Sequence, residues 1–183
     1  MHDASNCLAP KESKMKLHIG GIAVKEGWKI LNIKEGPGVD FVGDISDLGQ
    51  FPDECCSEVY ASHVLEHVPQ ERIVHTLSGI RRVLEPGGKL RVSVPDLDML
   101  CHLFINPRAS SEMKYHVMRM MFGGQTDAHD FHFIGFNERF LLAFLRQARF
   151  SHAERVGDFG IFEDASSYAP YGSPISLNVV ATR

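Results

Sequence analysis

The sequence predicts an α/β protein built around a seven-stranded, mostly parallel sheet with an antiparallel pair of strands at its C-terminal end. Two observations support this. Strand-like runs alternate with helical patterns through the middle of the 183-residue chain, which is typical of parallel sheets covered by helices. The helices lie mostly in the middle of the chain, and the last two strand candidates have only a loop between them, which indicates a mixed sheet with an antiparallel pair at the end.

The stretch 58–98 has the clearest pattern, which is strand, loop, helix, turn, strand. In its helical part the apolar residues recur at helical spacing: Ile73, Leu77, Ile80 and Leu84. Pro86-Gly87-Gly88 favours a turn, and residues 90–94 then alternate between apolar and polar, as a strand requires. Ligands of such sheets bind beyond the carboxyl ends of the strands, which here carry residues 62–67 and 95–98.

The remaining elements follow from the same patterns. Further strands are expected at 16–20, 28–33, 39–45, 152–159 and 175–181, and further helices at 97–105, 112–122 and 138–150. Only seven residues separate the first strand from Trp28, too few for a helical crossover, so an abbreviated loop is expected there. The helix expected at 112–122 is rich in Met, which favours adaptable core filling over a lid on an apolar ligand.

Length and charge limit the function classes. We expect residues 1–14 to be a disordered extension, because they are polar and aperiodic, and residues 15–183 to form one domain. A net charge of -4 without a basic run disfavours a nucleic-acid partner. No apolar run reaches the length of a membrane span, and the N-terminus lacks the apolar core of a signal peptide. A cytoplasmic protein with free thiols is expected, and its oligomeric state stays open.

Four motifs, in order, resemble class I S-adenosylmethionine-dependent methyltransferases, and most closely the predicted methyltransferases related to the type 11 domain. They are LHIGG at 17–21, GDISDL at 43–48, YASHVLEHV at 60–68 and RRVLEPGGKLRVSVPDL at 81–97. A weaker fifth match, GFNERFLLAFLRQARF, resembles the helix before the last strands of that family. The resemblance implies a Rossmann-like sandwich whose last strand is antiparallel, with the cofactor over the ends of the first strands.

The resemblance also implies S-adenosyl-L-methionine as the cofactor and a set of residues that bind it. Those residues are Gly20 and Gly21 beside the methionine and ribose, Asn32 at the ribose, Asp44 and Ile45 at the adenine, and Ser62 and His63 between cofactor and acceptor. The expected acceptor is a small molecule or a sugar or lipid precursor. Methyl transfer needs a base only when the acceptor loses a proton, and histidine is suited to that role near neutral pH. The candidates are His63, His67, His129 and His132, with His132 ranked first.

Two alternatives remain open. The family has a second spaced glycine where this chain has Ile22, and a carboxylate where it has Asn32. These differences motivate a protein that binds S-adenosylmethionine or a nucleoside without catalysis.

The second alternative is a metal site. His63, Glu66 and His67 spell H-x-x-E-H, the pattern of a metal-dependent hydrolase, but that site requires one continuous helix and Pro69 follows at once. His129 and His132 with Asp127 or Asp130 are a further possible cluster. We expect no metal at either.

Overall fold

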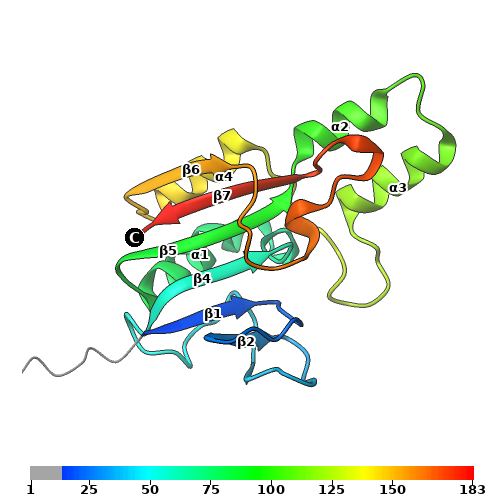
Figure 1. Cartoon of the computed structure of the whole chain (residues 1–183). Coiled ribbons are helices and arrows are strands. Elements are labelled where there is room, and N and C mark those ends of the chain that lie inside the picture. The colour runs from blue at the N-terminus through cyan, green and yellow to red at the C-terminus, as the bar shows by residue number, and fades with distance from the viewer. Residues whose placement is uncertain (1–13) are drawn as a thin grey trace, which may run out of the picture.

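The computed structural model describes residues 14–183, so the expectation for residues 1–13 lies outside the described part of the chain. Seven strands form one sheet in the order β3-β2-β1-β4-β5-β7-β6 (Figure 1). The strands are β1 Met15–Ile19, β2 Trp28–Asn32, β3 Phe41–Val42, β4 Cys56–Ser62, β5 Leu84–Pro95, β6 His152–Val156 and β7 Ser176–Thr182. The α-helices are α1 Ile73–Val83, α2 Leu97–Ile105, α3 Ser111–Phe122 and α4 Glu138–Gln147.

The sheet has the predicted mixture of directions. Neighbouring strands from β3 to β5 pair in parallel, whereas β7 runs antiparallel to both β5 and β6. The third strand is shorter than the predicted 39–45, because the chain leaves the sheet at Asp44. The carboxylate of Asp44 accepts a hydrogen bond from the Ser46 amide at 2.7 Å and so starts a turn.

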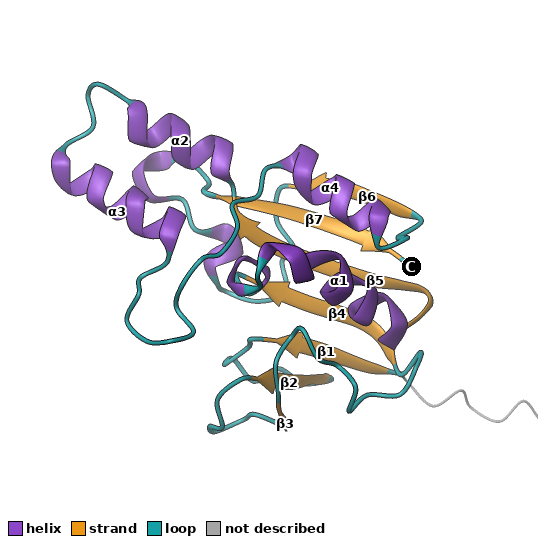
Figure 2. Cartoon of the chain, turned by 180° about the vertical axis from the view of Figure 1, so that it is seen from behind, coloured by secondary structure: helices purple, strands orange, loops and turns teal. Residues whose placement is uncertain are grey.

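In the described part of the chain, the α-helices that pack on the sheet lie on one of its faces. Figure 2 shows α1 and α4 side by side over β4, β5 and β7. Leu77 of α1 and Leu141 of α4 are fully buried against the sheet residues Val59 and Val92. This main core holds the parallel strands in place, so their carboxyl ends lie at one edge of the molecule.

A loop between β6 and β7 covers part of the opposite face (Figure 1). Phe162 of this loop packs on His18, Trp28 and Tyr60, with ring centroids 4.1, 5.4 and 4.8 Å away. The Tyr60 hydroxyl donates to Asp164 at 2.9 Å. The loop therefore takes the place that a second layer of helices would have.

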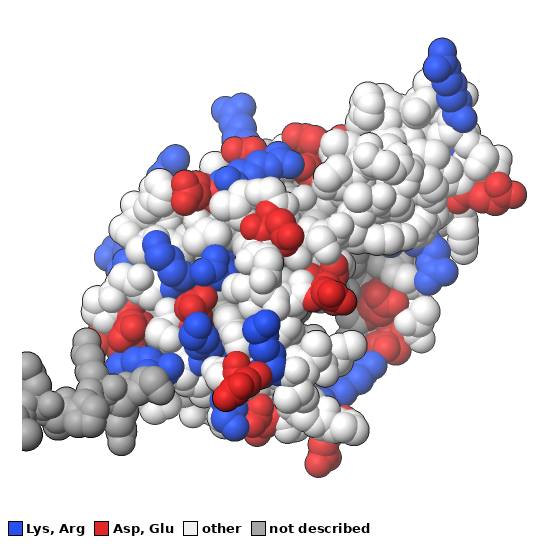
Figure 3. Space-filling model, in the orientation of Figure 1, with Lys and Arg blue, Asp and Glu red and all other residues white. Residues whose placement is uncertain are grey.

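Charged side chains occupy this same face near the amino ends of the strands. Glu58 of β4 lies between Lys16 and Arg91, at 2.8 and 3.1 Å, and blue and red atoms alternate on this surface in Figure 3. These pairs keep the uncovered part of the sheet polar.

The helices α2 and α3 project beyond the carboxyl ends of the strands (Figure 1). Their contact is a small second core of Leu100, Leu103, Val117 and Ile175, against which Met99, Met113, Met120 and Met121 pack. The prediction that Met fills a core is confirmed. No helix among residues 14–183 is long and apolar enough to cross a membrane.

Candidate cofactor and acceptor site

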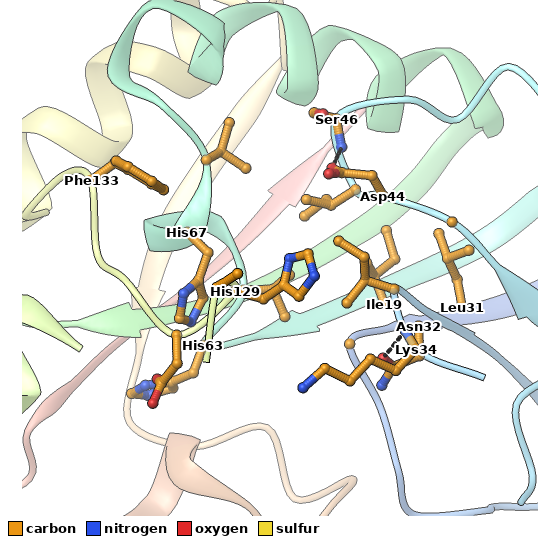
Figure 4. Close-up of a pocket in the computed structure, with 18 of the residues that line it drawn as sticks. Ile19, Leu31, Asn32, Lys34, Asp44, Ser46, His63, His67, His129 and Phe133 are labelled. Carbon is orange, nitrogen blue, oxygen red and sulfur yellow. Dashed lines mark hydrogen bonds between the residues drawn. The ribbon is translucent and has the colours of Figure 1, made fainter. Parts of the chain in front are cut away.

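A cavity of about 560 Å³ lies beyond the carboxyl ends of β1, β2 and β4, where ligands of parallel α/β sheets bind. Seven of the predicted cofactor-binding residues and candidate bases line it: Gly20, Asn32, Asp44, Ile45, His63, His67 and His129 (Figure 4). Three predicted residues do not line it: Gly21, Ser62 and His132. The structure thus brings predicted residues from the ends of the strands and from the loop after α3 together around one cavity.

The glycine turn after β1 allows close packing of the chain. Gly20 has φ +74°, and a side chain there would overlap Val64. A side chain at Gly21 would overlap the ring of His18. Gly21 therefore contributes by letting His18 pack beneath the turn, and Gly20 brings the backbone to the cavity wall.

Asn32 ends β2 and organises the turn next to the cavity. Its Nδ2 donates to the Gly21 carbonyl at 3.1 Å, and its Oδ1 accepts from the Lys34 amide at 3.0 Å. The Lys34 ammonium lies 2.7 Å from Asp127, across the cavity on the loop after α3. Asn32 thus stabilises the turn and keeps one amide hydrogen free for a ligand.

Glu66 is the most deeply buried ionisable group near the cavity. It is 1% exposed, and neither carboxylate oxygen has a hydrogen-bond partner among the described residues. Burial raises the pKa of Glu66 to about 8. Its Oε1 lies 3.4 Å from His63 Nδ1 and 4.0 Å from His132 Nε2.

The histidines fall into two groups. His63, His67 and His132 surround Glu66, and burial lowers the pKa of each, that of His63 to about 4. The rings of His67 and His132 meet edge to face with centroids 4.8 Å apart. His129 is exposed instead, and its ring points into the cavity (Figure 4).

Asp130 holds the loop that carries His129. Its Oδ2 accepts from the amide and hydroxyl of Thr126 at 3.1 and 2.8 Å, and its Oδ1 accepts from the Gly124 amide at 3.3 Å. Asp127 pairs with Lys34 and accepts from the His129 amide at 2.8 Å. Both aspartates thus hold the loop and its neighbours, and neither joins a group of metal-ligand spacing in the described chain.

Comparisons with known proteins agree with this geometry. Residues 23–92 match the model of a family described as a methyltransferase domain. No curated protein sequence matches the chain at a significant level. The solved structure of an S-adenosylmethionine-dependent methyltransferase from Archaeoglobus fulgidus is similar at 15% identity and a TM-score of 0.59, over 94% of this chain and 87% of that one.

Two further solved structures share the fold. One is an S-adenosylmethionine-dependent methyltransferase from Thermotoga maritima, at 17% identity and a TM-score of 0.56 over 96% of this chain and 84% of that one. The other is 1,6-didemethyltoxoflavin-N1-methyltransferase from Burkholderia thailandensis, solved with its substrate and S-adenosylhomocysteine, at 15% identity and a TM-score of 0.56 over 93% and 72%.

The match over residues 23–92 and the shared fold over nearly the whole chain make the protein similar to the S-adenosylmethionine-dependent methyltransferases. The lining of the cavity fits a ligand such as S-adenosylmethionine. Ile19, Leu31 and Ile45 provide apolar walls, while Asn32 and Asp44 provide polar groups.

Two features of the cavity were not predicted from the sequence. Lys34 and Phe133 line the cavity but lie outside the quoted motifs. Phe133 is 58% exposed, and its amide donates to the Glu66 carbonyl at 2.9 Å. Two aromatic residues at the end of the polar stretch 123–132, Phe131 and Phe133, are the sequence signal that could have indicated it.

His132 is the predicted base that the structure places elsewhere. Its ring does not line the cavity but packs behind His67, with Nε2 toward Glu66. The reason is that the His132 amide donates to the carbonyl of Phe122 at 3.2 Å, which ties this part of the loop to the end of α3.

Proposed function

We propose that the methyl acceptor of this enzyme is a small molecule, with sugars and lipid precursors included. The observation that carries this proposal is the size of the cavity, about 560 Å³, within the range of small-ligand sites. Cofactor and acceptor share that space, so a bulky acceptor would not fit. The net charge of -4 does not favour nucleic acid.

The cofactor takes the end of the cavity near β1 and β2 in this proposal. The Gly20 backbone and the free amide hydrogen of Asn32 face the methionine and ribose. Asp44 and Ile45 border the adenine, where Ile45 offers a buried apolar surface. Gly21 and Ser62 do not line the cavity, so in this proposal they support the residues of the cavity wall without touching the cofactor.

The acceptor takes the opposite end, between His129 and Phe133. In the reaction the bond from sulfur to the methyl carbon breaks as the bond from acceptor to carbon forms, and S-adenosylhomocysteine leaves. An acceptor that carries a proton passes it to a ring nitrogen of His129. His129 suits this role better than His63, because both ring nitrogens of His63 face protein groups, Ser176 at 2.8 Å and Glu66 at 3.4 Å.

Titration calorimetry with S-adenosylmethionine and S-adenosylhomocysteine tests the cofactor site. We expect both to bind and Asp44→Ala to weaken binding at least about tenfold, since the Asx turn that shapes the adenine end is lost. Asp158→Ala is the matched control, because Asp158 makes a similar turn with Gly160, at 3.0 Å, away from the cavity. Absence of heat at millimolar cofactor, or an equal effect of both variants, contradicts the proposal.

A second candidate function is binding of the cofactor or a nucleoside without catalysis. Ile22, at the position of the family's second glycine, is 82% exposed, and the family match begins only after the turn, at residue 23. Tight cofactor binding without methyl transfer to any tested acceptor would favour this function. Methyl transfer that His129→Gln abolishes would exclude it.

A further inference from the structure

Four ionisable side chains meet at the cavity wall, two of which line the cavity while two lie behind them, and the proposed function uses none of them for chemistry. They are His63 at the end of β4, Glu66 and His67 in the short 3-10 helix Leu65–His67, and His132 in the loop after α3. Glu66, His67 and His132 each offer a ligand atom, and these atoms lie within 4.8 Å of one another. We name this set of four residues the Glu66 cluster.

The hydrogen bonds around His63 determine where its protons lie. The Ser176 hydroxyl lies 2.7 Å from the carbonyl oxygen of Ala165, which accepts its one hydrogen. His63 Nε2, 2.8 Å from the same hydroxyl oxygen, therefore carries a hydrogen and donates it. In the neutral ring Nδ1 is then a lone pair, and it faces Glu66 Oε1 at 3.4 Å.

His67 presents a lone pair in the same way. His67 Nδ1 donates to the Phe131 carbonyl at 3.1 Å, so Nε2 is unprotonated in the neutral ring. His132 Nε2 lies 4.0 Å from Glu66 Oε1. A ring nitrogen that donates to a carbonyl while the other stays free is the usual arrangement of a metal-binding histidine.

Glu66 makes this cluster unusual. Its carboxylate is 1% exposed, and neither oxygen accepts a hydrogen bond from residues 14–183. A buried carboxylate without a partner costs several kcal/mol. One proton on Glu66 would satisfy one of the facing nitrogens only, whereas a divalent cation accepts lone pairs from the Glu66 carboxylate, His67 and His132 together.

We propose that the Glu66 cluster is a divalent metal site with Glu66, His67 and His132 as ligands and zinc as the favoured ion. Two imidazoles and one carboxylate are a frequent zinc ligand set, which leaves a fourth position open. Imidazole ligands disfavour magnesium and calcium, and zinc binds more tightly than manganese or iron(II). Ligand atoms around a tetrahedral zinc lie about 3.4 Å apart, so the side chains need to close by only about 1 Å.

This site differs from both metal patterns considered in the sequence. The H-x-x-E-H pattern needs His63 and His67 on one helix, but His63 has φ +53° and precedes the 3-10 helix. In the proposed site His132, from the loop after α3, is the second histidine ligand instead of His63. Because His67 lines the cavity as well, the ion would border the acceptor end of the site.

Metal uptake by the untagged full chain, after removal of metal with a chelator, tests the proposal without reference to methyl transfer. We expect equilibrium dialysis with zinc chloride to give one zinc per chain. The cobalt-substituted protein should show the visible absorption bands of a four-coordinate site. Glu66→Gln and His132→Asn should each weaken zinc binding by more than the roughly 10–100-fold that loss of an outer-shell partner costs.

His129→Asn is the matched control, because it removes a histidine of the same loop that lies outside the cluster, and it should leave zinc binding unchanged. Circular dichroism checks that each variant is folded. If Glu66→Gln fails to fold, His132→Asn and His67→Asn decide. Substoichiometric uptake by the parent chain, or uptake that these variants leave unchanged, overturns the metal site even if calorimetry establishes the cofactor site.

Discussion

Gly20 and Gly27, at the two ends of the β1–β2 connection, share a backbone conformation but differ in their surroundings. Gly20 has φ +74° and Gly27 has φ +80°. A side chain at Gly20 would overlap Val64, whereas nothing lies within 4 Å of one at Gly27. The strain of a positive φ is therefore common to both positions, and the steric conflict occurs at Gly20 alone.

We predict that Gly27→Ala costs about 1–2 kcal/mol of unfolding free energy from backbone strain, and that Gly20→Ala costs a further 1–3 kcal/mol, roughly, from overpacking. Urea denaturation of the two variants measures the difference. Gly20→Ala should also weaken S-adenosylhomocysteine binding, because the shifted turn narrows the cavity. Equal losses would mean that Val64 moves aside freely.

His129 is the residue on which the proposed proton transfer depends. We predict that His129→Gln lowers kcat for a proton-bearing acceptor by about 10²–10⁴-fold, while the Kd of S-adenosylmethionine stays the same. His75→Gln, an exposed position on α1, is the control. A parallel loss of cofactor affinity in His129→Gln would show that the ring supports the cofactor instead.

At the scale of elements, one loop forms most of the acceptor side of the site. The segment 123–137 connects α3 to α4, and several backbone hydrogen bonds fix it, three of them around the cavity side. The Gln125 amide donates to the Asp130 carbonyl at 2.9 Å, the His132 amide to Phe122 and the Phe133 amide to Glu66. The side chain of Asp130 adds three hydrogen bonds at the tip, so it fixes the part that carries His129.

Asp130→Ala should therefore loosen the tip without unfolding the sheet. Hydrogen exchange measured by mass spectrometry should show faster exchange in residues 123–130 and unchanged protection in β4 and β5, because local opening does not require global unfolding. We expect KM for the acceptor to rise while the melting temperature changes little. Faster exchange throughout the chain would contradict this local role.

At the scale of the whole molecule, the two faces of the sheet differ in composition and in response to pH. One face packs on α1 and α4 through aliphatic residues. The other buries His18 among aromatic rings, 5% exposed and with Nδ1 unpaired among residues 14–183. Burial lowers the pKa of His18 to about 4, against a partial opposing effect of Asp164.

The neutral form of His18 is thus favoured in the folded state. As the pH decreases, His18 of the unfolded chain binds a proton near pH 6.5, before His18 of the folded chain does. The contribution of His18 to stability is therefore most favourable above pH 6.5 and becomes less favourable as the pH decreases toward 4. At 1.36 kcal/mol per pH unit the loss is about 2 kcal/mol at pH 5. Urea titrations of the parent chain and His18→Phe at pH 7.5 and 5 measure it, since the variant lacks this contribution. An identical pH effect in both proteins would assign the loss to other groups.

The sequence alone determined the class of the fold, the strand order along the chain and the resemblance to methyltransferases. It could do so because periodicity, turns and motifs such as YASHVLEHV are local, and each restricts the chain without reference to distant residues. The confirmed examples are the βαβ unit, the abbreviated loop before Trp28 and the antiparallel end.

Only the tertiary structure decided which side chains meet. His132 is far from Glu66 along the chain, and it reaches this carboxylate because the loop after α3 is bonded to Phe122 and Glu66. His63 turns toward Glu66 through a left-handed backbone that no motif specifies. Such convergence depends on contacts between distant segments, which is why the sequence indicated a methyltransferase cavity but not the Glu66 cluster at its wall.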